Sequence, residues 1–385
     1  CIYQRKMERT VFILNHNRLK KKTYVIIPAL NPPQDFYRYL SDLNHVENMH
    51  LIVVNDGSGE EYQPLFSKIK SLSKCRVLDH KENRGKGAAL KTAFAFLRTD
   101  GEEDVQIVCA DCDGQHKVQD IICVAKESGL HPGTLILGTR RFSKGNIPWK
   151  SKLGNRVSSL LLYLTGGVWV GDTQTGLRAF HCSLLLPLLS IPGQRFEYEM
   201  EVLSYCMEHQ YPIHMIDIET VYENNNKNTH FRPIQDSFQV LGVVMKPVLK
   251  FLCSSFGCGI LDLVLFTIIY RCANGNLYMP NARAVLIATV WARTCSVALN
   301  YYINRNYVFS GGEKLKKAGI HWAKRYLALC AAITLSSASG VYFFHSLFPI
   351  SAGMAKIAVD CILFLASYQI QRKWVFSKRE VSYEV

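Results

Sequence analysis

The chain has 385 residues, which is long enough for two to three domains. Its net charge is +14, and 48% of its residues are apolar. Up to about residue 232 the apolar residues alternate with polar stretches, as in a soluble α/β protein, and after about residue 248 they form long runs. Basic residues gather beside the ends of these runs. This placement favours anionic lipid headgroups as partners and argues against nucleic acid.

The N-terminal residues 1–22 are basic and lack the apolar core of a signal peptide. We expect a tail that lies on a membrane surface or is disordered. The 13 cysteines are scattered, and many fall inside apolar runs. Cys109 and Cys112 form a C-x-x-C motif, but no second pair with the spacing of zinc ligands follows. This favours a reduced, cytoplasmic domain over a zinc or redox site.

Strand-like runs alternate with amphipathic stretches in the first part of the chain. The strand-like runs are residues 24–30, 50–55, 76–78, 105–110 and 134–138. This alternation predicts an α/β fold with a parallel sheet and right-handed crossovers. No G-x-G-x-x-G motif follows the first strand, which disfavours a dinucleotide-binding dehydrogenase.

Two further segments connect this part to the rest of the chain. Residues 150–165 predict an amphipathic helix with basic residues at its start. This helix either lies in a membrane interface or packs against the sheet, and the sequence leaves both alternatives open. Residues 234–250 lead without a break into the first long apolar run and are expected to couple the two domains.

Four apolar runs follow, at residues 251–270, 284–303, 326–348 and 350–370. Each is about long enough to span a membrane as a helix. The charged residues within them are Asp262, Arg293, Lys356 and Asp360. Lys356 and Asp360 lie one helical turn apart, so we expect structural pairing, with a lipid-phosphate pocket as the alternative.

The loops between the apolar runs differ in charge. Residues 304–325 and the segment after residue 370 are rich in lysine and arginine, whereas the opposite loops carry few basic residues. The positive-inside rule then places both termini and the middle linker in the cytoplasm. We therefore expect an integral membrane protein with four transmembrane helices and a cytoplasmic catalytic domain.

The apolar part also contains an internal echo. Residues 301–310 (YYINRNYVFS) match residues 368–377 (YQIQRKWVFS) at six of the ten positions. Each copy ends the second helix of a predicted hairpin. Two related hairpins explain this pattern, and an interfacial anchor of aromatic and basic residues is the alternative.

The expected carboxyl ends of the strands carry polar motifs. Asp111 and Asp113 follow a buried run one residue apart, so their side chains point to the same side of the strand. Open α/β sheets bind ligands at this edge. Two carboxylates there, with Gln115 as a further oxygen ligand, suit Mg²⁺ or Mn²⁺ bridging the phosphates of a nucleotide.

Other strand ends supply candidates for binding a nucleoside and phosphates. Asp56 follows the second strand, where a carboxylate can hold a ribose or a base edge. Residues 83–89 (NRGKGAA) open a helix whose glycines and N-terminus suit anions. The K-[ST] pair of a P-loop is missing, which argues against NTP hydrolysis. Arg140 and Arg141 follow the fifth strand and suit bidentate phosphate binding.

The segment DTQTGLRAF, which contains Asp172 and Arg178, completes the series PALN, VVNDGS, NRGKGAA, ADCDGQH and LGTRRF. Together these motifs resemble glycosyltransferase family 2, in particular the branch of dolichol-phosphate mannose synthase and bacterial polyprenyl-phosphate glycosyltransferases. They cover residues 24–232. The remainder resembles the small GtrA-like four-helix membrane domain that is fused to such enzymes in some prokaryotes.

The resemblance implies a GT-A fold and an inverting sugar transfer from a UDP- or GDP-linked nucleotide-diphosphate sugar to a polyprenyl phosphate, such as dolichyl or undecaprenyl phosphate. It divides the chain into a basic tail (1–22), a GT-A domain (23–232), a juxtamembrane amphipathic linker (233–250), a GtrA-like four-helix transmembrane domain (251–376) and a cytoplasmic tail (377–385). Two alternatives stay open: transfer to a lipid or saccharide hydroxyl, and a lipid-linked sugar transporter or scaffold with a degenerate site. The sequence leaves the oligomeric state open.

The resemblance also implies roles for single residues. The divalent metal would be held by Asp111, Asp113 and Gln115. The nucleotide sugar would be bound by Pro28, Leu30, Asn31, Asp56, Lys86, Asp111 and Cys112. The acceptor phosphate would be bound by Arg140, Arg141 and Lys152. The catalytic residues would be Asp113, Arg140, Asp172 and Arg178, the last as a cation behind the substrate-binding residues.

One motif departs from the family pattern P-x-Y-N-E, because Leu30 and Pro32 replace the aromatic and the acidic residue. The sequence therefore does not choose between uracil and guanine. A phosphate-monoester acceptor is largely ionised at neutral pH and needs no general base. Asp172 would be a base only for an alcohol acceptor, and its alternative is a helix cap in D-T-x-T. Glu199 matches the family, but its role is unassigned.

Overall fold

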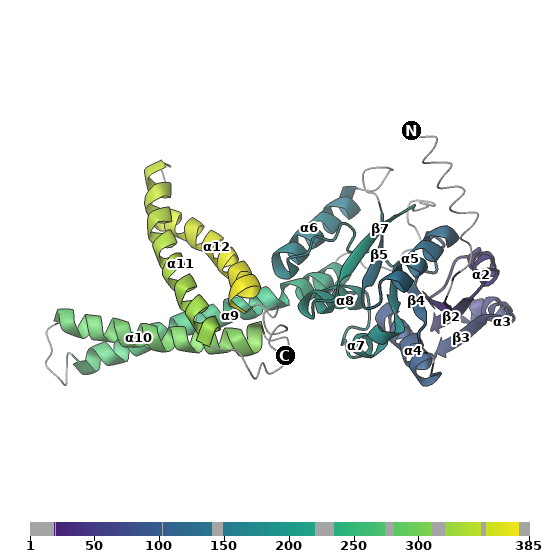
Figure 1. The fold of residues 1–385 in the computed structure, drawn as a ribbon, viewed down its shortest axis with the longest axis horizontal. Coiled ribbons are helices and arrows are strands. Elements are labelled where there is room, and N and C mark those ends of the chain that lie inside the picture. Colours follow the sequence, from purple (N-terminus) through teal and green to yellow (C-terminus); the bar gives the residue numbers. More distant parts are fainter. Residues whose placement is uncertain are drawn as a thin grey trace. The chain divides into compact units, whose positions relative to one another are not determined.

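The computed structural model describes residues 19, 21–101, 103–140, 149–219, 235–273, 281–309, 320–347 and 352–376. The chain divides into two compact units, Cys1–Val244 and Met245–Val385. The first combines strands and helices, and the second is helical (Figure 1). Most of the N-terminal tail, Arg141 and the C-terminal tail lie outside the described residues, as does the side chain of Lys152.

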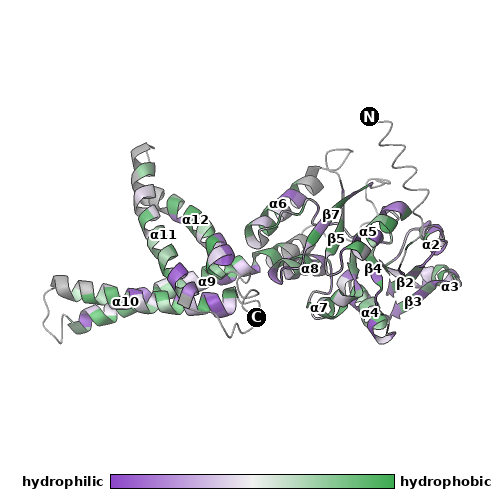
Figure 2. Ribbon diagram, viewed as in Figure 1, coloured by the Kyte–Doolittle hydropathy of each residue, from purple (hydrophilic) through white to green (hydrophobic). Residues whose placement is uncertain are grey.

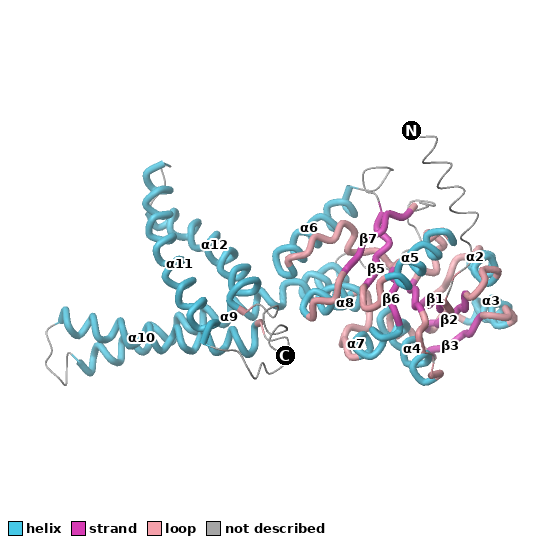
Figure 3. The backbone as a smooth tube through the Cα atoms, viewed as in Figure 1, coloured by secondary structure: helices cyan, strands magenta, loops and turns pink. Residues whose placement is uncertain are grey.

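The first unit is built on a seven-stranded sheet in the order β3-β2-β1-β4-β6-β5-β7. Neighbouring strands run parallel except at β6, which lies antiparallel between β4 and β5. The strands are β1 Thr23–Ala29, β2 Met49–Asp56, β3 Cys75–His80, β4 Gln106–Cys109, β5 Leu135–Arg140, β6 Arg178–His181 and β7 Ile213–Ile218. The five strands expected from the sequence are confirmed, and β6 and β7 add to them (Figure 3).

Helices cover both faces of this sheet, because successive residues of each strand point to opposite faces. Ile26 and Val54 face a core shared with α4 Lys86–Thr99, α7 Leu185–Leu189 and α8 Glu197–Glu208. Val25 and Val53 face a core shared with α2 Phe36–Asn44, α3 Gln63–Lys70 and α5 Val118–Leu130. Short 3-10 turns at Glu60–Tyr62 and Cys182–Leu184 precede α3 and α7.

The amphipathic helix expected at residues 150–165 is confirmed as α6, Trp149–Gly166. Leu162 is buried in the core beside the sheet. Leu153, Val157 and Leu160 are exposed at helical spacing and form an apolar stripe. One side of α6 therefore packs on the rest of the first unit, and the other side exposes the apolar stripe.

The described residues of the helical unit form long helices. They are α9 Gln235–Arg271, α10 Asn281–Ile303, α11 Ile320–Leu347 and α12 Ala352–Ile370, and π-helical turns at Asn304–Val308 and Gln371–Val375 end α10 and α12. Helix α9 starts before this unit and continues into it without a break, with Pro247 inside.

Apolar residues run along all of these helices (Figure 2). Within the described residues, one stretch is long and apolar enough to cross a membrane: Leu241–Arg271, with 31 residues and a mean hydropathy of 2.0. The four spans expected from the sequence are therefore not confirmed.

The internal echo has a structural counterpart, because its two copies contact each other reciprocally. Phe309 stacks on its counterpart Phe376, with 5.3 Å between the ring centroids. Tyr301 packs against Phe376 at 5.8 Å, and its counterpart Tyr368 packs against Phe309 at 5.6 Å. Residue-for-residue reciprocity is what an approximate two-fold relation between equal parts produces. The structure therefore favours two related hairpins over an anchor motif alone.

Candidate active site

The polar motifs lie at the carboxyl edge of the sheet, where the loops after β1 and β2 are tied together. The Asn31 N–H donates to Ser58 Oγ at 2.9 Å, and Asn31 Oδ1 accepts from the Gly59 N–H at 3.1 Å. Asn31 adopts a φ of 46°, a left-handed conformation that asparagine tolerates better than most residues. Asn31 thus shapes the loop in which Pro28 and Leu30 are expected to meet the nucleotide.

Asp56 ends β2 and is buried beneath the loop that opens α4. Its carboxylate accepts from the N–H groups of Arg84 at 3.0 Å and Gly85 at 2.8 Å, and it lies 2.7 Å from His80 Nδ1. Gly85 has a φ of 97°, a conformation that glycine adopts without strain. A carboxylate has about four acceptor sites; the loop takes two of them, and His80 at the end of β3 faces a third. The contact of Asp56 with the nucleoside stays a prediction.

Lys86 is the first residue of α4 and joins two carboxylates from different elements. Its Nζ lies 2.6 Å from Asp111 Oδ1 and 2.9 Å from Glu199 Oε1. Although burial opposes a charge on the amine, Asp111 and Glu199 raise the pKa of Lys86. Burial also opposes a charge on Asp111, but Lys86 and His116 hold its pKa well below the usual range. Lys86 and Asp111 therefore stay ionised at neutral pH.

Asp113 differs from Asp111 although only one residue separates them. Its Oδ1 accepts from the Gln115 N–H at 3.1 Å, across a turn in which Gly114 has a φ of 72°. Desolvation by the surrounding protein and repulsion from the Asp111 charge raise the pKa of Asp113. A carboxylate whose charged form is disfavoured in this way is stabilised by a nearby cation.

The surroundings of the two aspartates fit a divalent metal. His116 is buried with its Nε2 3.5 Å from Asp111 Oδ2, and within the described part of the chain neither ring nitrogen has a hydrogen-bond partner. The same holds for the buried Tyr39 hydroxyl, whose pKa is raised by burial and by the charges of Asp113 and Asp111. Since buried polar groups are normally paired, these atoms indicate a site that a bound group completes. With Gln115, the donors are mostly oxygens, which suits Mg²⁺ or Mn²⁺.

The loop before β6 supports this centre from behind. Gly176 lies so close to the Asp111 carboxylate that a Cβ there would collide with both oxygens. Arg178 is buried and donates to the carbonyl oxygens of Thr175 at 3.1 Å and Glu199 at 2.6 Å. Arg178 thereby joins this loop to α8, and its role as a cation behind the substrate-binding residues stays a prediction.

Arg140, at the end of β5, forms a bidentate pair with Asp172. Arg140 Nε lies 2.6 Å from Asp172 Oδ2 and Nη2 lies 3.0 Å from Oδ1, and Asp172 is fully buried. The helix-cap interpretation of Asp172 is wrong, because the described residues that follow it form a turn leading into β6. A carboxylate with both oxygens held by a guanidinium is a poor general base. We therefore interpret Asp172 as the residue that orients Arg140.

Asn155 anchors α6 to the loop that carries Asp172. Its Nδ2 donates to Gly171 O at 2.7 Å, and its Oδ1 accepts from the Thr173 N–H at 2.9 Å and Oγ1 at 3.0 Å. The helix with the exposed apolar stripe therefore also fixes the Arg140–Asp172 pair. Lys152 belongs to the same helix.

The C-x-x-C motif carries neutral thiols. Burial raises the pKa of Cys109 and of Cys112 to about 12 each, and all described cysteines are free. Because thiolates are the form that binds zinc and exchanges disulfides, burial disfavours that form at both cysteines; the preference for a reduced domain over a zinc or redox site stays a prediction.

The roles of three residues near the central aspartates were not predicted from the sequence: Glu199, His116 and Tyr39. Glu199 had a signal, the alternating acids of RFEYEME, but their spacing does not reveal which acid meets Lys86. His116 directly follows Gln115, just after the D-x-D motif. Its position next to the expected metal ligands was therefore also a signal in the sequence. Tyr39 had no signal, because an amphipathic helix contains many such tyrosines.

With this geometry in place, family comparisons give a clear result. Residues 24–186 match Glycosyl transferase family 2, and residues 250–376 match the GtrA/DPMS transmembrane domain. The chain thus contains a glycosyltransferase family 2 domain, followed by a C-terminal GtrA/DPMS transmembrane domain. It is therefore a membrane-bound glycosyltransferase with a GT-A-like, mostly parallel sheet.

Individual relatives match about half of the chain. A UDP-N-acetylglucosamine–dolichyl-phosphate N-acetylglucosaminyltransferase of Methanococcus voltae is 29% identical over 223 residues, which are 52% of this chain and 86% of the relative. An uncharacterized protein of Methanocaldococcus jannaschii is 29% identical over 209 residues, 53% of this chain and 83% of the relative. The structure of glucosyl-3-phosphoglycerate synthase from Mycobacterium tuberculosis with UDP is 18% identical and covers 59% of this chain and 80% of its own, with a TM-score of 0.45.

Proposed function

We propose that this glycosyltransferase transfers a sugar, with inversion, from a UDP- or GDP-linked sugar to a polyprenyl phosphate at the cytoplasmic face of a membrane. The observation that carries this proposal is the charged centre, in which Lys86 pairs with Asp111 while Asp113 keeps a raised pKa that a cation would relieve. The Methanococcus voltae relative, whose name includes a dolichyl-phosphate acceptor, supports the same acceptor class.

The residues of the site divide the chemistry between donor and acceptor. A bound Mg²⁺ or Mn²⁺, held by the D-x-D carboxylates and Gln115, would neutralise charge on the leaving diphosphate. Lys86 adds a positive charge at the N-terminus of α4, where backbone N–H groups also favour anions. Arg140 has five N–H donors in a planar fork, which allows it to bind an acceptor phosphate beside Asp172. Such a phosphate is already ionised at neutral pH and needs no general base.

The helical unit fits an acceptor with a long prenyl tail. Four spans formed by α9 to α12, with the catalytic unit and both termini in the cytoplasm, would leave the tail in the bilayer while its phosphate reaches the active site. The match to the GtrA/DPMS transmembrane domain and the basic loops support this topology. The apolar stripe of α6 suits the membrane interface.

The test is lipid labelling by membranes that contain the full chain, supplied with labelled UDP- or GDP-sugars and polyprenyl phosphate. The wild type labels the lipid with Mg²⁺ or Mn²⁺, and EDTA abolishes labelling. Asp113→Asn lowers the rate by about 10³-fold, because the metal contributes several kcal/mol of charge stabilisation. Asp104→Asn, at a surface aspartate paired with Lys21 and His181, is the matched control and keeps full activity. Absence of metal-dependent labelling with every donor would refute the proposal.

Transfer to a lipid or saccharide hydroxyl remains the alternative, and it requires a general base. The expected base, Asp172, is buried and bound to Arg140, so no observation favours this alternative. Labelling of a diacylglycerol or saccharide in place of polyprenyl phosphate in the same assay would favour it.

A further inference from the structure

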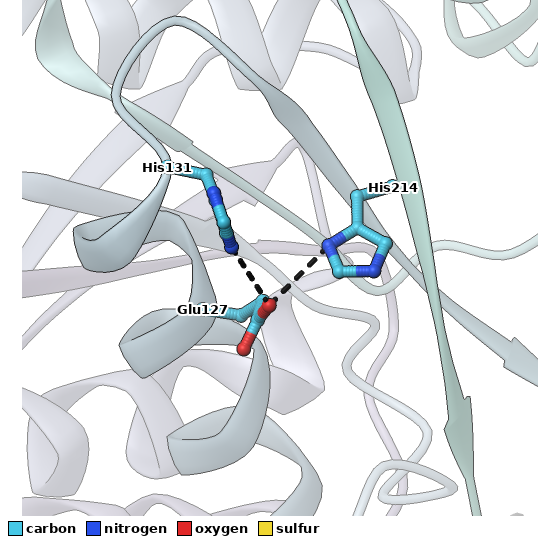
Figure 4. A group of neighbouring side chains, drawn as sticks. All are labelled: Glu127, His131 and His214. Carbon is cyan, nitrogen blue, oxygen red and sulfur yellow. Dashed lines mark ion pairs between the residues drawn. The ribbon is translucent and has the colours of Figure 1, made fainter.

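We propose that Glu127, His131 and His214 form a second metal site, which binds Zn²⁺ at the edge of the sheet opposite to the D-x-D motif (Figure 4). Glu127 lies in the last turn of α5, and His131 directly follows that helix. His214 is the second residue of β7. These positions lie where the parallel strands β5 and β7 begin, whereas the central aspartates follow the carboxyl end of β4.

The ligand atoms of this cluster already converge. Glu127 Oε1 lies 3.2 Å from His131 Nε2 and 3.3 Å from His214 Nδ1, and the three atoms all lie within 4.8 Å of one another. Two atoms bound at about 2.0–2.1 Å to one tetrahedral Zn²⁺ are about 3.4 Å apart. Figure 4 shows each imidazole turning a nitrogen toward the same carboxylate. Two of the three ligand separations thus match, and the third, between the two histidine nitrogens, is at most 4.8 Å.

The donor chemistry separates this site from the catalytic one. Two imidazole nitrogens and one carboxylate suit Zn²⁺, whereas the oxygen donors of the D-x-D motif suit Mg²⁺ or Mn²⁺. Both histidine side chains are 50% exposed, which leaves room for a water molecule as the fourth ligand. The two sites therefore differ in the metal that their donor atoms favour.

The backbone around the cluster is held in register by hydrogen bonds. The Leu135 N–H donates to Pro212 O at 2.9 Å, and the Thr134 N–H donates to His131 O at 3.2 Å. The segment that follows α5 is thus joined to the segment that precedes β7. Little reorganisation is needed for the cluster to receive an ion.

The position of the cluster indicates what the metal does. Strand β7 is the last strand of the described sheet and pairs there with β5. Beyond its carboxyl end, Glu219 pairs at 2.9 Å with Lys117, the residue that precedes α5. Zn²⁺ at Glu127 would clamp the start of β7 to the end of the same helix. Helix α5 would then hold the edge strand at both ends, which also protects the edge from pairing with other chains.

The test is Zn²⁺ binding to the full chain in detergent, stripped of metal, free of any histidine tag and kept reduced, with excess Mg²⁺ present. Competition with a chromophoric chelator should find one equivalent of Zn²⁺ in the wild type that His131→Ala, His214→Ala and Glu127→Gln each lose. His45→Ala, at an exposed histidine on the C-terminal side of α2, is the matched control and keeps it. Zn²⁺ should also slow hydrogen exchange of residues 211–218 in the wild type and the control alone.

Each outcome decides the proposal. The ligand side chains are partly exposed, so the variants are expected to keep the wild-type Tm without Zn²⁺ and their glycosyl transfer with Mg²⁺. At a hundredfold excess of Zn²⁺ over its Kd, the Tm rises by about 5 °C in the wild type and not in the variants. Equal Zn²⁺ binding by the wild type and the three variants, or no binding to the wild type, would overturn the proposal in favour of a metal-free glutamate–histidine pairing.

Discussion

Two polar centres of this molecule differ in how completely their buried groups are hydrogen-bonded. In the catalytic unit, charged groups around Asp111 bridge different elements, while the neighbouring His116 and Tyr39 keep buried atoms without hydrogen-bond partners among the described residues. In the helical unit, the amide of the fully buried Asn304 has hydrogen-bond partners at both its oxygen and its nitrogen. Its Oδ1 accepts from Ser254, and its Nδ2 donates to Asn300 at 2.6 Å and to Gln371 at 3.1 Å.

This difference distinguishes a ligand-binding site from a hydrogen-bond network that stabilises the packing of helices. An unpaired buried group costs stability, so such groups persist where a ligand completes them. A fully bonded neutral network costs little and fixes one arrangement of the helices. Asn304 and Gln371 hold equivalent positions in the internal echo, so their hydrogen bond joins the two hairpins. The following substitutions test this contrast.

The largest effect is expected for Lys86→Met, which removes the cation between Asp111 and Glu199. Two largely buried carboxylates then face each other, so the free energy of unfolding should fall by about 3–5 kcal/mol and sugar transfer should stop. Denaturant unfolding and the labelling assay measure both effects. Lys70→Met, which breaks an exposed pair with Asp79, is the control and should change stability by less than about 1 kcal/mol. Equal losses of unfolding free energy in Lys86→Met and Lys70→Met would show that the buried charged centre contributes no more to stability than an exposed ion pair.

Asp172→Asn should lower transfer by about 10²-fold, because a misplaced Arg140 binds the acceptor phosphate in a poorer geometry. The pH dependence of kcat should stay unchanged, since Asp172 takes no proton. Arg140→Lys should cause a similar loss, and the double variant should lose little more, because both changes break the same bidentate pair. Loss of the acidic limb of the pH profile in Asp172→Asn would instead identify a general base.

In the helical unit, Asn304→Leu should lower the free energy of unfolding by about 2 kcal/mol, because it removes three buried side-chain hydrogen bonds, each worth on the order of 0.5–1.5 kcal/mol. Unfolding by denaturing detergent measures this loss. The control is Asn306→Leu, because its exposed side chain donates to Tyr302 O of the helix it follows. Transfer should persist wherever Asn304→Leu remains folded. Loss of transfer in the folded variant would show that the network belongs to the active site.

The sequence predicted those parts of the fold that local patterns encode. Residues 51–54 are apolar and are followed by turn residues, so both the strand and the motif after it could be predicted. Strand β6, Arg178–His181, has four residues, and its place between β4 and β5 depends on pairing with distant strands. Strand β7, Ile213–Ile218, alternates weakly and pairs with β5 far back in the chain. No local period records such pairing.

The same limit applies to the candidate site. The convergence of Asp111 and Asp113 follows from strand geometry and could be predicted. Their different electrostatics could not, because the cation that distinguishes them comes from the start of α4. The helix-cap interpretation of Asp172 failed because D-T-x-T looks alike in a cap and in a turn. Its partner Arg140 lies at the end of another strand, and that contact determines its role.

The smallest effect is expected for Ser296→Ala. This variant tests whether single hydrogen bonds between the helices of the helical unit each contribute little to its stability. Ser296 Oγ on α10 donates to Asp262 Oδ1 on α9 at 2.9 Å, and Asp262 also pairs with Arg293 at 3.4 Å. Because Arg293 keeps the carboxylate paired, losing the hydroxyl should lower the free energy of unfolding by only about 0.6 kcal/mol.

The control for Ser296→Ala is Ser339→Ala, because the Ser339 hydroxyl is exposed and donates to Leu335 O of its own helix. Unfolding in the same detergent series compares the two variants. A cost above about 2 kcal/mol for Ser296→Ala would mean that Asp262 depends on this hydroxyl. Asp262 would then resemble Asp113, whose charged form is disfavoured by its surroundings, and the helical unit would contain a polar site of its own.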